Sequence, residues 1–181
     1  MPPERTLHAA RQHAAPLGRR LGSDRAVQVR RARARDLPEL VLLNVVADED
    51  NHRLVPDIGG RRIDRRRARR YWKHALRDPR ALVLVAARDL RIDGVIAADL
   101  ICLRSRLAPV RRYVYLHSLW VEPAARRLGL GRALTRAALA WAARRGARQA
   151  RLEAAANNPR ALGLYRSLGF ALREVMMARP L

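Results

Sequence analysis

Apolar runs of strand length and longer stretches with helical spacing alternate along this chain. Short apolar runs predict strands at residues 27–30, 81–87, 95–103 and 110–121, the last three forming an antiparallel meander. Apolar positions three and four residues apart predict helices at about residues 36–46, 61–76 and 133–145. A strand at residues 150–154, a helix from residue 158 and a final strand at about residues 173–179 complete the pattern.

Helix boundary signals support two of these assignments. Asp36, with Glu39 three residues later, predicts a capping-box-like helix start. Asn158 and Pro159 suit the N-cap and first position of the last helix, and Gly169 is placed to end it.

This order of elements predicts an α/β protein of the α+β mixed-sheet kind, with a central, mostly antiparallel sheet flanked by helices. Residues 1–24 carry several prolines and glycines, so we expect a basic, poorly ordered N-terminal tail. We expect residues 25–181 to form a single domain with one core. Only eleven residues, 171–181, follow Phe170, so we expect a sheet edge that a second subunit could pair with, and a monomer or a homodimer.

Composition excludes several classes of protein. Apolar residues make up 49% of the chain, too many for disorder, and no apolar run approaches the length of a membrane span. The N-terminus lacks the apolar core of a secretory signal, and the single Cys102 can form no internal disulfide. We therefore expect a cytoplasmic protein without a membrane partner. One cysteine and five histidines, none at ligand spacing, also predict no metal site.

The formal net charge of +22 changes this picture, because such a field attracts polyanions. Nucleic acid, an acyl-CoA or an anionic surface would all suit it, although an arginine-rich composition can also reflect codon usage. The helix around residues 61–77 carries the densest basic face, which is either solvated or a polyanion patch: Arg62, Arg65, Arg66, Arg69, Arg70 and Lys73. Its other side carries an apolar stripe expected to face the core: Ala68, Tyr71, Trp72, Ala75 and Leu76.

The loop at residues 126–132 is the best candidate for chemistry. It joins a predicted strand to a predicted helix and contains Gly129 and Gly131. Backbone N–H groups and the helix dipole favour an anion there, and glycine lets a phosphate approach closely. The alternative is an ordinary turn that uses two glycines. The loop is not a P-loop, since no Gly-Lys-Ser/Thr follows, and it lacks the third glycine of a dinucleotide fingerprint.

Two motifs resemble those of the GCN5-related N-acetyltransferase (GNAT) superfamily. The first is Arg/Gln-x-x-Gly-x-Gly/Ala after a Val-x-Pro turn, here Arg126-x-x-Gly129-x-Gly131 after Val121-Glu122-Pro123. The second is Asn-x-x-Ala-x-x-x-Tyr-x-x-x-Gly-Phe, matched in full at residues 158–170. The resemblance is sharp over residues 113–170. It implies the GNAT acyl-CoA N-acyltransferase fold, in which the fourth and fifth strands splay apart around the cofactor.

The resemblance also implies acetyl-CoA as the acyl donor. Backbone amides at residues 127–132 would hold its pyrophosphate, and residues 119–121 would pair with the pantetheine arm. The cofactor-binding residues implied are Leu119, Trp120, Val121, Arg126, Arg127, Leu128, Gly129, Leu130, Gly131, Arg132, Asn158 and Tyr165. The acidic segment at residues 47–60 falls where the family places a loop that lines the acceptor pocket, and its alternative is a solvated loop.

Tyr165 matches the tyrosine that lies near the CoA sulfur in the family, so we expect it to be the general acid; a phenol of pKa about 10 can protonate a thiolate. Its alternative role is to pack the last helix. His117 matches a histidine position of the arylalkylamine branch and is the candidate general base, although a strand histidine is often only packed. The competing bases are Glu122, Asp99, Glu153 and the segment Asp48–Asp50. An amine that arrives neutral needs no base.

These observations predict an acetyl-CoA-dependent N-acyltransferase that moves an acetyl group to a primary amine by direct transfer in a ternary complex. One alternative uses the charge: an acetyltransferase acting on aminoacyl-tRNA, with residues 61–80 binding the phosphate backbone. The other is a non-catalytic CoA-sensing or nucleic-acid-binding module on the same fold.

Overall fold

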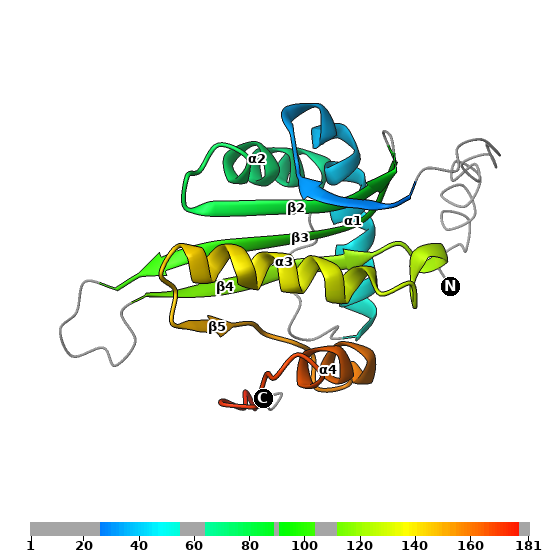
Figure 1. Ribbon diagram of the computed structural model, residues 1–181. Coiled ribbons are helices and arrows are strands. Elements are labelled where there is room, and N and C mark those ends of the chain that lie inside the picture. Colours follow the sequence, from blue (N-terminus) through cyan, green and yellow to red (C-terminus); the bar gives the residue numbers. More distant parts are fainter. Residues whose placement is uncertain (1–25, 55–63, 89–90, 104–111, 178–181) are drawn as a thin grey trace, which may run out of the picture.

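The computed structural model describes residues 26–54, 64–88, 91–103 and 112–177 (Figure 1). Its elements are β1 (Gln28–Arg31), η2 (Ala34–Asp36), α1 (Leu37–Leu54), α2 (Arg65–Ala75), β2 (Ala81–Arg88), β3 (Arg91–Cys102), β4 (Arg112–Val121), η3 (Pro123–Ala125), α3 (Leu130–Arg144), β5 (Gln149–Arg151) and α4 (Pro159–Arg166). The predicted order of strands and helices is confirmed through the last helix. The predicted tail at residues 1–24 lies outside the described residues. In the described part of the chain, no helix is both long and apolar enough to span a bilayer.

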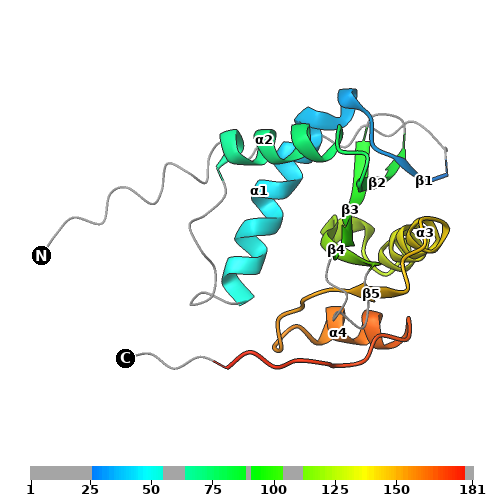
Figure 2. The same cartoon turned by 90° about the vertical axis from the view of Figure 1, so that its left-hand side faces the viewer.

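The five strands form one sheet in the order β1-β2-β3-β4-β5. All neighbours pair antiparallel except β4 and β5, which run parallel. Helices α1 and α2 cover one face, and α3 covers the other (Figures 1 and 2). The sheet therefore separates two cores, one against α1 and α2 that includes Leu40, Trp72 and Val85, and one against α3 that includes Ile96 and Leu134.

Helix α2 shows why the apolar stripe forms a core face. The Asp64 carboxylate accepts a hydrogen bond from the Arg67 N–H at 2.8 Å and begins the helix. Ala68 and Trp72 are fully buried, as predicted, whereas Tyr71 keeps 36% of its surface exposed. The expected core stripe is thus right for most of its members, and Tyr71 lies at its edge.

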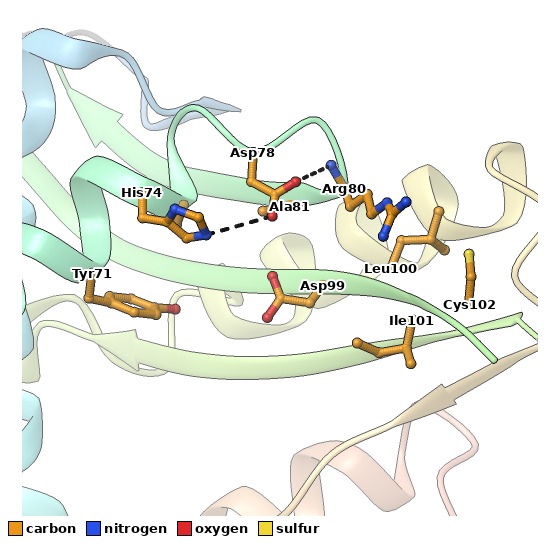
Figure 3. A pocket seen from close by; sticks show the side chains of 10 residues that line it. Tyr71, His74, Asp78, Arg80, Ala81, Asp99, Leu100, Ile101 and Cys102 are labelled. Atoms are coloured by element: carbon orange, nitrogen blue, oxygen red, sulfur yellow. Dashed lines mark hydrogen bonds and ion pairs between the residues drawn. The ribbon is translucent and has the colours of Figure 1, made fainter. Parts of the chain in front are cut away.

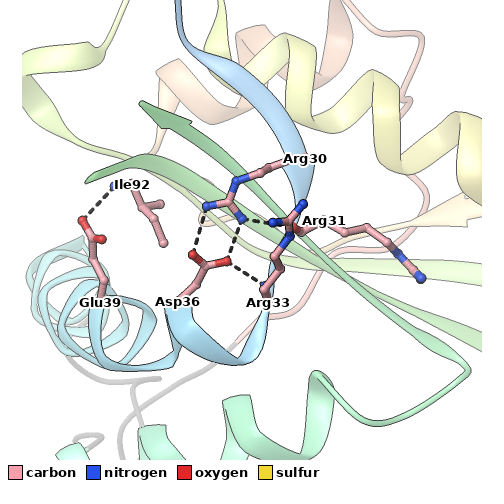
Figure 4. A network of polar contacts seen from close by, with 6 residues as sticks. All are labelled: Arg30, Arg31, Arg33, Asp36, Glu39 and Ile92. Atoms are coloured by element: carbon pink, nitrogen blue, oxygen red, sulfur yellow. Dashed lines mark hydrogen bonds and ion pairs between the residues drawn. The ribbon is translucent and has the colours of Figure 1, made fainter. Parts of the chain in front are cut away.

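Helix α1 begins at Leu37, directly after Asp36, as predicted, but Asp36 and Glu39 do not form the hydrogen bonds of a capping box. The Asp36 carboxylate accepts hydrogen bonds from the Arg33 N–H at 2.6 Å and from Arg30 at 2.7 and 2.9 Å (Figure 4). Glu39 instead accepts a hydrogen bond from the Ile92 N–H of β3 at 2.8 Å. Burial opposes the charge on Asp36, but its hydrogen bonds from Arg30 and Arg33 outweigh burial and lower its pKa. Both carboxylates therefore join α1 to the sheet.

The predicted acidic loop is also wrong in its first half. Helix α1 continues to Leu54, so Asp48, Glu49 and Asp50 are helical. The remainder of that segment, residues 55–60, lies outside the described residues. A second boundary also differs, because β3 begins at Arg91, before the strand predicted at residues 95–103. Asp93 in this added part of the strand is fully buried, and its carboxylate pairs with Arg88 at 2.9 Å. A salt bridge thus keeps a charged residue inside a strand.

A final strand was expected at residues 173–179. Its described part, residues 173–177, is not a strand, and residues 178–181 lie outside the described residues. All seven residues of 171–177 are exposed, among them Leu172, Val175, Met176 and Met177. Their apolar positions do not alternate, so no single face would be buried in a sheet. In the described residues, the sheet ends at β5.

Candidate functional site

Strands β4 and β5 separate halfway along β4. They pair in parallel only from Tyr113 with Gln149 to Tyr115 with Arg151. Strand β4 then continues to Val121, whereas β5 ends at Arg151. The splay implied by the resemblance is thereby confirmed. Leu119, Trp120 and Val121 lie on the part of β4 that has no partner in β5, although Trp120 and Val121 still pair with β3.

A β-bulge in β4 lies at the start of this unpaired part. Ala97 of β3 pairs with His117, but Val95 pairs with Trp120, so two residues of β4 lie opposite one of β3. Ser118, one of the two, has a φ of +53°. Such an extra residue shifts which side chains face each side of the sheet. His117 precedes the bulge and lies opposite Ala97, on the face toward α2; because of the extra residue, Trp120, three residues later, packs on that same face.

The loop between β4 and α3 is shaped by two residues with positive φ. Arg127 has a φ of +66° and Gly129 a φ of +77°. Residues in this conformation next to ordinary ones turn successive N–H groups inward, which forms a concave anion site. Gly129 is also the N-cap of α3 and has no side chain to bond the first turn. The N–H groups of that turn thus remain without a side-chain cap.

Gly131 is needed for space rather than for its backbone angle. A Cβ built on it would lie 3.3 Å from Leu164 Cδ2, which is closer than ordinary contact. The first turn of α3 is thereby packed directly against α4. The Arg132 guanidinium strengthens this contact by donating a hydrogen bond to Ser167 Oγ at 3.0 Å.

The three arginines expected at the phosphate loop differ in their surroundings. Arg126 donates from Nε to the Val121 carbonyl at 3.0 Å and approaches Asp50 Oδ2 at 3.5 Å. It is thus directed back along β4 and toward α1, and Arg132 is directed toward α4. Arg127 is exposed, as is Leu128 at 63% of its surface, and Leu130 is partly buried. Arg127 is therefore the arginine best placed to meet a phosphate.

Helix α4 begins and ends as its motif predicts. The Asn158 side chain accepts a hydrogen bond from the Ala161 N–H at 3.1 Å, and Gly169 ends the helix with a φ of +85°. In this structure Asn158 is an N-cap, and its part in cofactor binding stays a prediction. Next to it, the Asn157 amide donates to the Leu54 carbonyl at the end of α1. That bond joins the start of α4, which carries Tyr165, to the end of α1, which carries Asp48, Glu49 and Asp50.

Tyr165 lies on the inner part of α4. Its ring is partly buried and packs edge-on against Phe170, with 5.7 Å between centroids. Burial raises the pKa of its phenol above the ordinary value of 10.0, so the hydroxyl stays protonated at neutral pH. This arrangement suits both expected roles, because a packed phenol can still donate a proton.

His117 is at the centre of a polar cluster built from three elements. Its Nε2 lies 3.0 Å from Asp99 Oδ2 of β3, and its Nδ1 lies 3.0 Å from the Tyr71 hydroxyl of α2. Ser118 Oγ is 3.2 Å from the same Nδ1. A carboxylate only accepts hydrogen bonds, so we assign the ring proton to Nε2 and the lone pair to Nδ1. Tyr71 then donates its hydroxyl proton to that lone pair.

The competing bases lie in different places. Asp99 contacts His117 directly, so the two act together. Glu153 lies beside Tyr115, whose ring stacks on His117 at 5.9 Å; burial, with the Glu153 carboxylate adding to it, raises the pKa of Tyr115. Asp50 faces Arg126 on the loop side instead. Tyr71 was missed from the sequence, where its helical spacing predicted only a core position.

The comparisons with known proteins agree with this geometry. The family model described as Acetyltransferase (GNAT) family matches residues 49–170. A mutant of a Bacillus halodurans protein is similar in structure, with a TM-score of 0.74 and 23% identity over 85% of this chain and 99% of that one. A predicted acetyltransferase with acetyl-CoA from Clostridium acetobutylicum has a TM-score of 0.65 and 18% identity, covering 85% and 96%.

A third similar structure is an aminoglycoside antibiotic 6'-N-acetyltransferase from Acinetobacter haemolyticus. Its TM-score is 0.64 at 20% identity, covering 86% of this chain and 99% of that one. No match was found among curated proteins.

Proposed function

This chain belongs to the acetyltransferase (GNAT) family, and from that premise we propose that it transfers an acetyl group from acetyl-CoA to a primary amine within a ternary complex. One observation carries the proposal: β4 splays from β5 directly before a loop whose backbone turns its N–H groups inward. The splay offers unpaired strand backbone to the pantetheine arm. The loop offers N–H groups and a helix N-terminus to the pyrophosphate.

The residues at the loop fit such a donor. Gly129 leaves open space beside the backbone, Gly131 lets α3 pack closely against α4, and Arg127 is exposed where a phosphate would approach. Leu119, Trp120 and Val121 supply the unpaired backbone, although the Val121 carbonyl already accepts a bond from Arg126. Acetyl-CoA supplies the thioester, whose carbonyl carbon is attacked by the amine. The protein supplies position and proton transfer.

Proton transfer requires one group that gives and one that takes. Tyr165 gives a proton to the departing sulfur, since its buried phenol is protonated at neutral pH. His117 takes the proton that the amine loses, and Asp99 at 3.0 Å stabilises the imidazolium that forms. The hydrogen bond to Asp99 also orients the ring, so its other nitrogen is the one that accepts.

Acetyl-CoA binding measured by calorimetry tests the proposal. We expect wild-type protein to bind with micromolar affinity, and the Gly129→Glu variant to lose binding through strain at positive φ and charge repulsion. An Ala140→Glu variant is the matched control, because Ala140 is exposed on the same helix, three turns from the loop. Absence of acetyl-CoA binding by the wild-type protein at low salt would contradict the proposal.

The acceptor class has a second candidate, because one face of α2 is strongly basic. Six cationic residues there are all exposed: Arg65, Arg66, Arg67, Arg69, Arg70 and Lys73. We propose aminoacyl-tRNA as the alternative acceptor on this observation. Release of free thiol against a panel of small amines and aminoacyl-tRNAs separates the two. Activity that falls steeply with salt supports the nucleic acid, because each neutralised phosphate releases counterions.

A non-catalytic CoA-sensing module is the remaining alternative. A Tyr165→Phe variant that binds CoA and keeps full biological activity would favour it. Cytoplasmic location and the choice between monomer and homodimer stay predictions.

A further inference from the structure

Both ring nitrogens of His117 already have partners, and this limits how an amine can reach it. Nε2 is bonded to Asp99, and the Nδ1 lone pair is covered by the Tyr71 hydroxyl. An amine could use that lone pair directly only by displacing Tyr71. We propose that Tyr71 itself receives the proton of the acceptor amine while passing its own proton to His117, and that the amine reaches Tyr71 from the cavity beside α2. This inference rests on the proposed acetyl transfer.

The position of Tyr71 is well determined by packing. Its ring meets Trp72 edge-on at 4.8 Å and His117 edge-on at 6.1 Å. Trp72 is fully buried and anchors this turn of α2 to the sheet. Tyr71 nevertheless keeps 36% of its surface exposed, so one side of the ring remains open to a ligand. A rigid ring with one open side is suited to positioning a hydroxyl between a substrate and a base.

The proton balance of the step is simple. The amine attacks in its neutral form, so an acceptor that enters as an ammonium ion first gives one proton to water. After the neutral nitrogen has bonded to the thioester carbon, it carries a positive charge and a further proton to lose. That N–H bond breaks as a new bond to Tyr71 Oη forms, and the Tyr71 O–H bond breaks as a bond to His117 Nδ1 forms. His117 becomes an imidazolium held by Asp99, and Tyr71 ends as it began. The leaving sulfur receives its proton from Tyr165.

The relay must move both protons together rather than through a free phenolate. Burial raises the pKa of Tyr71 to about 12, so an isolated phenolate is strongly disfavoured at neutral pH. Asp99 adds to this by repelling a negative charge on the phenol oxygen. A hydroxyl that gives one proton as it takes another avoids that charge.

A cavity of about 360 Å³ opens beside these groups, between the C-terminal part of α2 and the end of β3 (Figure 3). Tyr71 and Asp99 line it, together with His74, Asp78, Arg80 and Cys102. Its volume suits a small molecule rather than a macromolecule. Asp78 and Asp99 give the cavity two carboxylates against the single guanidinium of Arg80, and this local negative charge in an otherwise basic chain favours a cationic amine over an acidic one. The acceptor class inferred is therefore a small cationic primary amine.

Removing the Tyr71 hydroxyl tests the relay. We expect the Tyr71→Phe variant to keep its acetyl-CoA affinity while kcat falls about 100-fold, the size typical of a lost proton-transfer group. Tyr113→Phe is the matched control. Tyr113 lies on the same face of β4 as His117, but its ring packs against Arg151 instead of contacting His117. Thermal unfolding of both variants shows whether the fold is retained; the ring that packs on Trp72 is unchanged in Tyr71→Phe.

Two further readouts separate a relay from simple packing. The rate can be measured in mixtures of H₂O and D₂O and plotted against the fraction of D₂O. The plot should be curved for the wild type, because two protons move together, and straight for Tyr71→Phe. The double variant Tyr71→Phe with His117→Gln should lose little more than either single variant, because a relay fails as a unit. The pH profile would report the groups facing His117 together: Asp99, Tyr71, Tyr115 and, through Tyr115, Glu153.

The cavity has its own test. A Cys102→Trp variant should raise the KM of the amine at least tenfold while leaving the KM of acetyl-CoA unchanged, whereas Ala140→Trp, on the exposed face of α3, should alter neither. If wild-type protein transfers acetyl groups and Tyr71→Phe transfers them equally fast with the same deuterium dependence, the relay is refuted and the proposed function stands. If the wild-type protein binds acetyl-CoA but transfers its acetyl group to no amine, both are refuted.

Discussion

The proposed donor side and the proposed acceptor side of this molecule are built in different ways. The donor side is one continuous piece of chain, from the end of β4 through the loop to the start of α3. Its shape follows from local features, namely a bulge, two residues with positive φ and a close helix contact at Gly131. The acceptor side joins side chains from α2, β3 and β4 that meet only when the sheet and helices pack. Its geometry therefore depends on the core beneath it.

The largest effect should come from that core. Replacing Trp72 with alanine removes a fully buried indole beneath the acceptor side, and we expect a loss of about 3–5 kcal/mol in the free energy of unfolding. Chemical denaturation measures this loss. Leu42→Ala on α1 is the control, since Leu42 is 48% exposed and should change stability far less. Equal losses in the two variants would contradict the dependence of the acceptor side on its core.

A chemical change at the acceptor side should leave the donor side intact. The His117→Gln variant keeps polar atoms at the ring position but cannot accept a proton at neutral pH. We expect kcat to fall by about two to three orders of magnitude, with unchanged acetyl-CoA affinity. Steady-state kinetics and calorimetry measure the two quantities, and Glu122→Gln serves as a control among the alternative bases. An unchanged kcat in His117→Gln would point to an amine that needs no base.

The salt bridge at the start of α1 should show a pH dependence that tests how the acceptor-side scaffold is held. The pKa of Asp36 is lowered in the folded protein, so its contribution is present above the ordinary value of 3.8 and is lost as the pH falls through the lower folded value. We expect Asp36→Asn to cost about 1.5–3 kcal/mol at neutral pH. Denaturation curves should show this difference between variant and wild type shrinking below about pH 4. A difference that stays constant down to pH 2 would contradict the assignment.

The smallest effect should be found on the donor side. Asn158→Ala removes the N-cap of α4 and should cost about 1 kcal/mol, whereas Asn158→Ser should keep most of that stability. Unfolding experiments give the cost, and calorimetry gives the acetyl-CoA affinity of each variant. If both variants lose affinity equally, the amide itself binds the donor; if only alanine does, Asn158 acts by positioning α4.

Much of the fold follows from the chain's local patterns. The sequence predicted the order of strands and helices along the chain, the start of α4 at Asn158 and its end at Gly169. These could be predicted because caps and periodicity act over a few residues. Three local predictions failed because long-range contacts, or their absence, decided the outcome. Glu39 accepts a hydrogen bond from β3 instead of from its own helix. Helix α1 continues through the acidic residues to Leu54, and no strand follows β5 in the described residues.

The proposed donor site also follows from the sequence. Gly129 and Gly131 stand at fixed spacing between a strand and a helix, and that local order is enough to predict an anion site. Tyr165 could be chosen in the same way from its motif. The surroundings of Arg126 could not be predicted, because Asp50, which it approaches, lies 76 residues earlier in the chain.

The sequence by itself determined the family, the order of the elements and the loop proposed to hold the donor, since each depends on residues close together in the chain. Only the tertiary structure decided the acceptor side. Tyr71 is 46 residues from His117 and Asp99 is 18 residues from it, and neither spacing carries a periodic or capping signal. Their meeting depends on how α2 lies across the sheet and on the pairing of β3 with β4, which puts Asp99 and His117 on the same face. Packing of the buried core sets both, so a pattern read along the chain cannot show which polar side chains will face each other.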